Sequence, residues 1–121
     1  MKKVVFVLTS RGNYAKLKNL ILLFISSKKF KVHIIIGGAL VLDKYSKIIQ
    51  KDLIENFSYD EVVYFQVEGE NNLTMAKSCS IALNEFSIIF NKLKPDYVFV
   101  LADRFETIAI AMAAAFLNIK L

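Results

Sequence analysis

Four short, almost wholly apolar segments alternate along this chain with longer segments in which apolar residues recur every three or four positions. The short segments cover residues 3–9, 31–37, 61–66 and 96–101 and are rich in β-branched and aromatic side chains. Apolar runs without alternation are typical of strands that are buried on both faces of a parallel sheet. The pattern therefore predicts a parallel sheet that is covered by helices on both sides.

The longer segments predict four helices. Apolar stripes at helical spacing cover residues 14–25, 45–53 and 75–93, and Pro95 follows the third stripe, where it ends that helix. Tyr14 belongs to the buried face of the first helix. Residues 105–117 form an alanine-rich segment that is apolar on nearly every face, so we expect the fourth helix to be deeply buried.

Strand and helix segments alternate with the spacing of right-handed crossover units. This order predicts a doubly wound, Rossmann-like α/β fold with parallel strands in the order 3-2-1-4. Residues 118–121 leave the fourth helix and look like the beginning of a fifth strand. We therefore expect residues 1–121 to be one amino-terminal domain that is truncated at the start of strand five, with an unpaired sheet edge there. A complete small domain with a frayed tail is the alternative.

Cysteine and histidine are too scarce for a disulfide framework or a structural zinc site, because the chain has one of each, Cys79 and His33. We expect Cys79 to lie in the core, His33 to be a hydrogen-bonded structural residue, and no metal to be bound. The longest apolar run, residues 108–117, is too short to span a bilayer, and no signal peptide is apparent. These features predict a cytoplasmic protein without a membrane partner.

Positive charge is concentrated in the first part of the chain. The formal net charge is +5, with 16 Lys and Arg against 11 Asp and Glu, and residues 1–50 hold a single acid, Asp43. A nucleic-acid-binding domain is therefore one alternative. No run of five or six like charges occurs, so solvated lysines on helix surfaces are the favoured explanation, and no nucleic-acid partner is expected.

In an open parallel sheet, ligands bind outside the carboxyl ends of the strands, so the residues that follow each strand are the candidate site. Arg11, Gly12 and Lys16 follow the first strand and open a helix, which suits a phosphate or diphosphate. Gly38 follows the second strand and permits close approach of the backbone.

Two acids follow the fourth strand. Asp103 and Glu106 have the spacing of a capping box, so helix capping alone accounts for them. Placed beside Arg11 and Lys16 at one sheet edge, however, Asp103 is also a candidate proton acceptor. The glycine-rich patterns of dinucleotide and nucleoside triphosphate sites are missing, and we expect no cofactor.

Several stretches together resemble the hydrolysing UDP-N-acetylglucosamine 2-epimerases of sialic-acid-type sugar biosynthesis. They are TSRGNYAKL at 9–17, LVLDKY at 40–45, EGENN at 68–72 with TMAK at 74–77, LKPD at 93–96 and ADRFET at 102–107. The resemblance covers essentially the whole chain. It implies the amino-terminal half of a two-domain, GT-B-like fold and a nucleotide-sugar substrate held between the two halves. It also implies a homo-oligomer when the protein is full length.

The resemblance also implies roles for individual residues. Arg11 and Lys16 match basic residues that face the diphosphate and sugar, and Asp103 matches a carboxylate implicated in proton transfer. Arg104 and Glu106 match motif positions that we assign to substrate binding. Gly38 is assigned to substrate binding as well, because it permits close approach of the backbone. The implied reaction eliminates the nucleotide diphosphate to give a 2-acetamidoglucal, and hydration then releases N-acetylmannosamine.

Two departures from the family pattern and one gap accompany the resemblance. Leu40 stands where many members have histidine, and Ala102 stands where many have glycine. The departure at Leu40 indicates a subgroup with a different nucleotide or sugar substituent. The family's other catalytic carboxylates and nearly all its nucleotide-binding residues follow the segment present here, so we expect this chain alone to be inactive. A non-catalytic α/β binding module is the second alternative.

Overall fold

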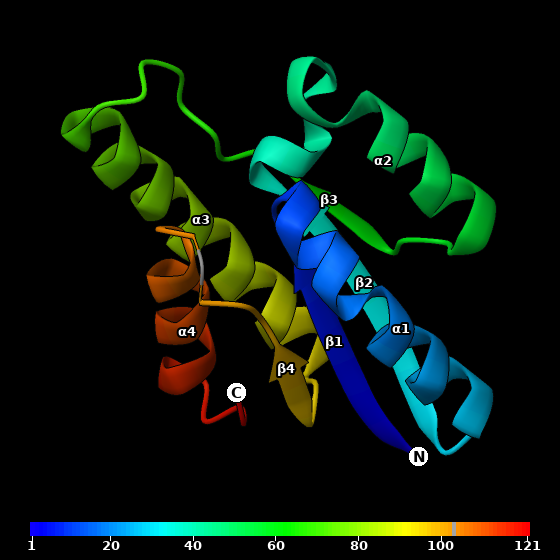
Figure 1. Cartoon of the computed structure of the whole chain (residues 1–121). Coiled ribbons are helices and arrows are strands. Elements are labelled where there is room, and N and C mark those ends of the chain that lie inside the picture. Colours follow the sequence, from blue (N-terminus) through cyan, green and yellow to red (C-terminus); the bar gives the residue numbers. More distant parts are fainter. Residues whose placement is uncertain (103) are drawn as a thin grey trace.

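The computed structural model describes residues 1–102 and 104–121, without the side chains of residues 43–46 and 54. Strands and helices alternate along the chain (Figure 1). In order they are β1 (Lys2–Leu8), α1 (Arg11–Ser27), β2 (Phe30–Gly37), the short 3-10 helix η1 (Gly38–Val41), α2 (Asp43–Asn56), β3 (Glu61–Val63), α3 (Asn72–Leu93), β4 (Tyr97–Phe99) and α4 (Thr107–Phe116).

The sheet has the strand order β3-β2-β1-β4, and all three pairings are parallel. This confirms the expected order. β1 lies at the centre, where Val4 is level with Val32 of β2 and with Tyr97 of β4. The carboxyl ends of the strands therefore meet at one edge of the sheet.

Helices cover both faces of the sheet, α1 and α2 on one face and α3 and α4 on the other (Figure 1). Successive residues of β1 point to opposite faces, so Phe6 packs under α1 while Val5 and Val7 pack under α3 and α4. The Phe6 ring stacks on Phe99 at a centroid distance of 4.9 Å. Burial on both faces explains why the strand sequences are continuously apolar.

β3 and β4 are three residues long, shorter than the segments 61–66 and 96–101 expected from the sequence. β4 begins after Asp96, whose side chain accepts a hydrogen bond from the Lys3 backbone N–H at 2.7 Å. After β3, the chain leaves the sheet and Phe65 turns its buried side chain against Gly37 and Gly38.

α4 is shorter than the expected helix and is buried on one face only. Ile110 and Ala113 are buried against α3, but Ile108 is 63% exposed and Phe116 is 78% exposed. The expectation of a deeply buried helix therefore holds for one side of α4 only, the side that meets α3 and the sheet. The opposite side of α4 is apolar and open to solvent.

The last residues run beside β4. Lys120 forms a parallel bridge with Tyr97, and the Val98 N–H donates to the Lys120 carbonyl at 2.8 Å. This single bridge places Lys120 beside β4 at the edge of the sheet. Among the helices of the described residues, none combines the length and apolar character needed to cross a membrane.

A polar cluster joins α1 to α2. Tyr14, which is buried as expected, donates its phenolic hydrogen to Asp52, and Lys18 donates to the same carboxylate oxygen at 3.1 Å. These hydrogen bonds, from Tyr14 first and Lys18 second, lower the pKa of Asp52. Burial, followed by the hydrogen bond to Asp52, raises the pKa of Tyr14.

His33 lies in β2 as expected, but the expected hydrogen bonds are not seen. Its Nδ1 lies 3.5 Å from Asp60 Oδ1, and neither ring nitrogen has a hydrogen-bond partner among the described residues. Asp60 instead accepts a hydrogen bond from the Ile34 backbone N–H at 2.9 Å. The Asp60 carboxylate thus binds the backbone of β2 through Oδ2, while its Oδ1 lies beside the imidazole without a hydrogen bond to it.

Candidate active site

A cavity of about 570 Å³ opens at the carboxyl edge of the sheet. Segments that follow all four strands contribute to its walls. Its lining residues are Ser10, Arg11, Gly12, Ala39, Gln66, Val67, Glu70, Thr74, Met75, Ser78, Arg104 and Phe105. The position agrees with the general rule for ligand sites in open α/β sheets.

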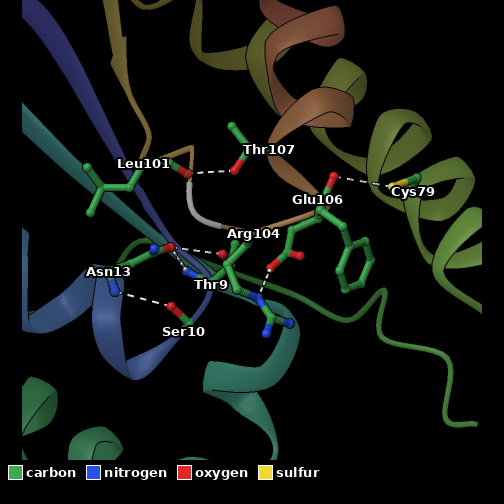
Figure 2. Close-up of polar contacts among 9 residues, drawn as sticks. Thr9, Ser10, Asn13, Cys79, Leu101, Arg104, Glu106 and Thr107 are labelled. Atoms are coloured by element: carbon green, nitrogen blue, oxygen red, sulfur yellow. Dashed lines mark hydrogen bonds and ion pairs between the residues drawn. The ribbon is translucent and has the colours of Figure 1, made fainter. Parts of the chain in front are cut away.

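The amino terminus of α1 forms the wall that follows β1. Ser10 caps this helix, and its hydroxyl oxygen accepts a hydrogen bond from the Asn13 backbone N–H at 3.1 Å (Figure 2). The buried Asn13 side chain accepts hydrogen bonds from the Thr9 N–H and hydroxyl, at 3.0 and 2.9 Å. These bonds hold the turn so that exposed Arg11 and the helix amino terminus face the cavity, an arrangement that suits an anion.

Gly38 shapes the wall that follows β2 without lining the cavity itself. Its φ of 58° lies in the left-handed region, and an added Cβ would lie 2.8 Å from the Phe65 ring. Glycine is therefore required here by the backbone turn and by packing. The next residue, Ala39, reaches the cavity, whereas Leu40 is fully buried in the core under α1 and α2.

Arg104 forms the wall that follows β4, and a buried carboxylate holds it in place. Arg104 Nε donates to Glu106 Oε1 at 3.1 Å, and the Glu106 side chain has no exposed surface (Figure 2). Arg104 also lies against the Phe105 ring, with its guanidinium carbon 5.3 Å from the ring centroid. Glu106 thus contacts Arg104 from behind, and it is not among the cavity's lining residues.

Two hydrogen bonds hold the segment around Arg104. The Thr107 hydroxyl donates to the Leu101 carbonyl at 2.6 Å, and the Cys79 thiol donates to the Phe105 carbonyl at 3.7 Å (Figure 2). Burial, and next the nearby Glu106 charge, raises the pKa of Cys79. Cys79 therefore acts as a neutral donor beside the core, consistent with its expected structural role.

The segment between β3 and α3 supplies the remaining wall. Asn71 and Thr74 form a capping box at the start of α3. One turn further on, buried Ser78 accepts a hydrogen bond from the Val67 N–H at 2.8 Å. This bond fixes the chain at Val67, so that Gln66 and Val67 both line the cavity.

The structure brings two of the expected substrate-binding residues to the cavity, Arg11 and Arg104. Lys16 is exposed on α1 outside the lining set, while Gly38 and Glu106 are buried next to it. Asp103, the expected catalytic residue, lies outside the described residues. Glu106 does not take the expected place inside the helix, because α4 begins at Thr107 and Glu106 precedes it without making a side-chain cap.

The sequence reasoning missed the wall that follows β3. The sequence predicts site residues only after the first, second and fourth strands, and it predicts a third strand that runs to residue 66. The strand ends at Val63, so Gln66 and Val67 fall at the ligand edge. The rule that sites follow strands would have found them had the strand end been known. No group of three or more potential metal-ligating side chains occurs within the described part of the chain.

Comparison with known proteins decides the family. The model of the UDP-N-acetylglucosamine 2-epimerase family matches residues 24–121. The chain belongs to this family. The fold class expected from the sequence is confirmed as well, because 2-epimerases of known structure share the four-stranded parallel sheet with flanking helices, and this chain belongs to the amino-terminal half of their GT-B-like fold.

Individual relatives match essentially the whole chain. Polysialic acid biosynthesis protein P7 of Escherichia coli is 28% identical over 121 residues, which are 100% of this chain and 31% of that protein. GDP/UDP-N,N'-diacetylbacillosamine 2-epimerase (hydrolyzing) of Campylobacter jejuni is 27% identical over 99% of this chain and 31% of its own length. The chain thus spans just under a third of these relatives.

A solved 2-epimerase structure supports the fold assignment. UDP-GlcNAc 2-epimerase from Neisseria meningitidis, determined with bound UDP-GlcNAc, superposes with a TM-score of 0.77 at 19% identity. The superposition covers 97% of this chain and 30% of the Neisseria chain. At this identity the similarity establishes the shared architecture.

Proposed function

We propose that the protein containing this chain is a hydrolysing nucleotide-sugar 2-epimerase. Its substrate is UDP-N-acetylglucosamine or a related nucleotide-activated amino sugar, and its products are N-acetylmannosamine, or the corresponding 2-epimer, and the nucleoside diphosphate. Membership of the 2-epimerase family supports the epimerase class over a non-catalytic module or a nucleic-acid-binding domain.

The observation that carries the proposal is the cavity with two guanidinium groups at its walls. Arg11 at the start of α1 and Arg104 after β4 both line it, together with the amino terminus of α1. Guanidinium groups and helix amino termini favour phosphate oxygens. A leaving diphosphate gains negative charge as its bond to the sugar breaks, and groups positioned in this way stabilise that charge.

In the proposed reaction, Asp103 removes the proton from C2 of the sugar. The bond from C1 to the diphosphate oxygen breaks, and the diphosphate leaves with the bonding electrons to give a 2-acetamidoglucal. Water then adds across the double bond, with hydroxyl at C1 and a proton at C2 on the opposite face. Lys16 assists Arg11 at the diphosphate, while Glu106 and Gly38 support the site from behind the walls.

The remaining parts of the proposal concern the whole protein. A second domain closes the cavity from the other side and carries most of the nucleotide contacts, as in a GT-B-like cleft. Residues 1–121 are then the amino-terminal domain, which has no turnover by itself. We also propose a homo-oligomer that works in the cytoplasm.

The test is the fate of UDP-N-acetylglucosamine when it is incubated in D2O with the protein that carries this chain. We expect free UDP and free N-acetylmannosamine with one deuterium at C2, followed by NMR. Formation of the epimeric nucleotide sugar without release of UDP would contradict the hydrolysing reaction. A lack of turnover with UDP- and GDP-linked amino sugars would contradict the epimerase assignment itself.

A further inference from the structure

The wall between β3 and α3 carries polar groups that the proposed diphosphate contacts do not use. Gln66 lines the cavity, and its carbonyl oxygen Oε1 is buried with no hydrogen-bond partner among the described residues. A buried acceptor without a donor is unfavourable and uncommon in folded proteins. Its position in a cavity wall indicates that a ligand supplies the donor.

A second group in the same wall complements this acceptor. Ser78 is fully buried, and its oxygen already accepts the Val67 N–H at 2.8 Å. Its hydroxyl hydrogen still has to be donated, and within the described part of the chain no acceptor for it is found. Val67 directly follows Gln66, so the bond from Val67 to Ser78 ties the segment that carries Gln66 to α3, and both residues line the same cavity.

Apolar side chains surround this pair. Met75 and Phe105 line the same cavity, and Phe105 is held by the thiol of Cys79 through its backbone carbonyl. A ligand group that fits this wall offers one N–H donor, one carbonyl acceptor and a small apolar end. An acylamino group has these three features, whereas a phosphate has neither an N–H donor nor an apolar end.

We propose that Gln66 and Ser78 bind the acylamino substituent of the sugar and select for it. The substituent's N–H donates to Gln66 Oε1, its carbonyl oxygen accepts from the Ser78 hydroxyl, and its acyl methyl group packs on Met75 and Phe105. This inference rests on the proposed function, since it assigns the sugar end of the same cavity whose arginines hold the diphosphate. The two walls together orient the substrate.

The test compares affinities of the whole protein for UDP, UDP-glucose and UDP-N-acetylglucosamine by calorimetry. Wild type is expected to prefer the N-acetylated sugar over UDP-glucose. Gln66→Met keeps the side-chain length and removes the acceptor, so this preference should fall by roughly tenfold, the effect of one hydrogen bond, with UDP affinity unchanged. Asn84→Leu, which removes an exposed amide of α3 outside the cavity, is the matched control and should keep the preference.

Ser78→Ala should reduce the preference for the N-acetylated sugar as well. Its thermal midpoint is measured too, because the substitution also removes the hydrogen bond from Val67.

A second test needs no variant. It is the nuclear Overhauser effect from the acetyl methyl of bound UDP-N-acetylglucosamine to the Met75 methyl or the Phe105 ring. We expect this effect to be present. Its absence from a saturated complex would overturn the inference even if a variant failed to fold.

The outcomes separate the two proposals. A wild-type protein that binds UDP but does not distinguish the two sugars overturns the inference and leaves the diphosphate site intact. An unchanged preference for UDP-N-acetylglucosamine in the Gln66→Met variant would also overturn the inference and leave the diphosphate site intact. A wild-type protein that binds none of the three compounds overturns the proposed function, and the inference falls with it.

Discussion

Glu106 is a carboxylate without exposed surface, and Arg104 is its ion-pair partner among the described residues. Its second oxygen, Oε2, is buried without a hydrogen-bond partner in the same part of the chain. The free energy of unfolding should therefore fall when Arg104 is removed, because a buried charge that loses its partner is strongly unfavourable.

From this pair we expect Arg104→Ala to lower the free energy of unfolding by about 3 kcal/mol, the low end for a broken buried pair, because Arg104 itself is partly exposed. The double variant Arg104→Ala with Glu106→Gln should recover part of the loss, since no charge is then left buried. Urea unfolding measures all variants. Exposed Arg11→Ala is the control and should change stability by less than about 0.5 kcal/mol. Equal losses for Arg11→Ala and Arg104→Ala would contradict this account.

Asp103 and Arg11 should separate catalysis from binding in the whole protein. Asp103→Asn cannot accept a proton, so we expect turnover to fall by ~10²–10⁴ while the thermal midpoint changes little. Arg11→Ala should weaken nucleotide-sugar binding together with turnover, because it faces the proposed diphosphate position. Turnover of Asp103→Asn above about a tenth of wild type would count against a catalytic carboxylate at this position.

At the scale of elements, the contact of α1 with α2 should make stability depend on pH. The folded pKa of Asp52 is lowered by Tyr14 and Lys18, so its contribution is present above the ordinary aspartate pKa, about 3.9, and is lost as pH falls through the lower folded pKa. We expect Asp52→Asn to be less stable than wild type at pH 7. The difference should shrink below pH of about 4. A difference that stays constant from pH 7 to pH 3 would exclude this linkage.

The sequence predicted elements well where burial alone determines them and less well where individual contacts decide. The apolar runs predicted four parallel strands and their order because a buried parallel strand leaves a continuous pattern. The predicted end of β3 at residue 66 was wrong. Phe65 continues the apolar run in the sequence, but its side chain packs on Gly37 and Gly38 outside the sheet. The predicted start of α4 at residue 105 was too early. The helix begins at Thr107, and Glu106 pairs with Arg104 instead of forming a side-chain cap.

The candidate site shows the same division. Arg11 was predictable because it follows β1 directly and opens a helix. Gln66 and Ser78 were not, because their relation depends on the hydrogen bond from Val67 to α3, which joins residues 11 positions apart. The burial of Leu40 was likewise hidden, since only the turn at η1 directs its side chain into the core.

At the scale of the whole molecule, the exposed apolar face of α4 should govern how the isolated chain behaves. Ile108, Met112 and Phe116 are exposed along one helix, which is a large apolar surface for a small domain. We expect the 121-residue chain alone to self-associate and to release no N-acetylmannosamine from UDP-N-acetylglucosamine. Light scattering and NMR measure the two properties. A monomer at high concentration would contradict the first expectation, and product release would contradict the second.

The central place of β1 has a consequence for hydrogen exchange. Residues Val4, Phe6 and Leu8 have no exposed surface, and the strand pairs with β2 on one side and with β4 on the other. Its partners come from distant parts of the sequence, so no local opening can free its amides. The β1 amides should therefore exchange with D2O only when the whole domain unfolds, and their rate reports the global free energy of unfolding. The first strand of the chain is thus expected to be the last to exchange.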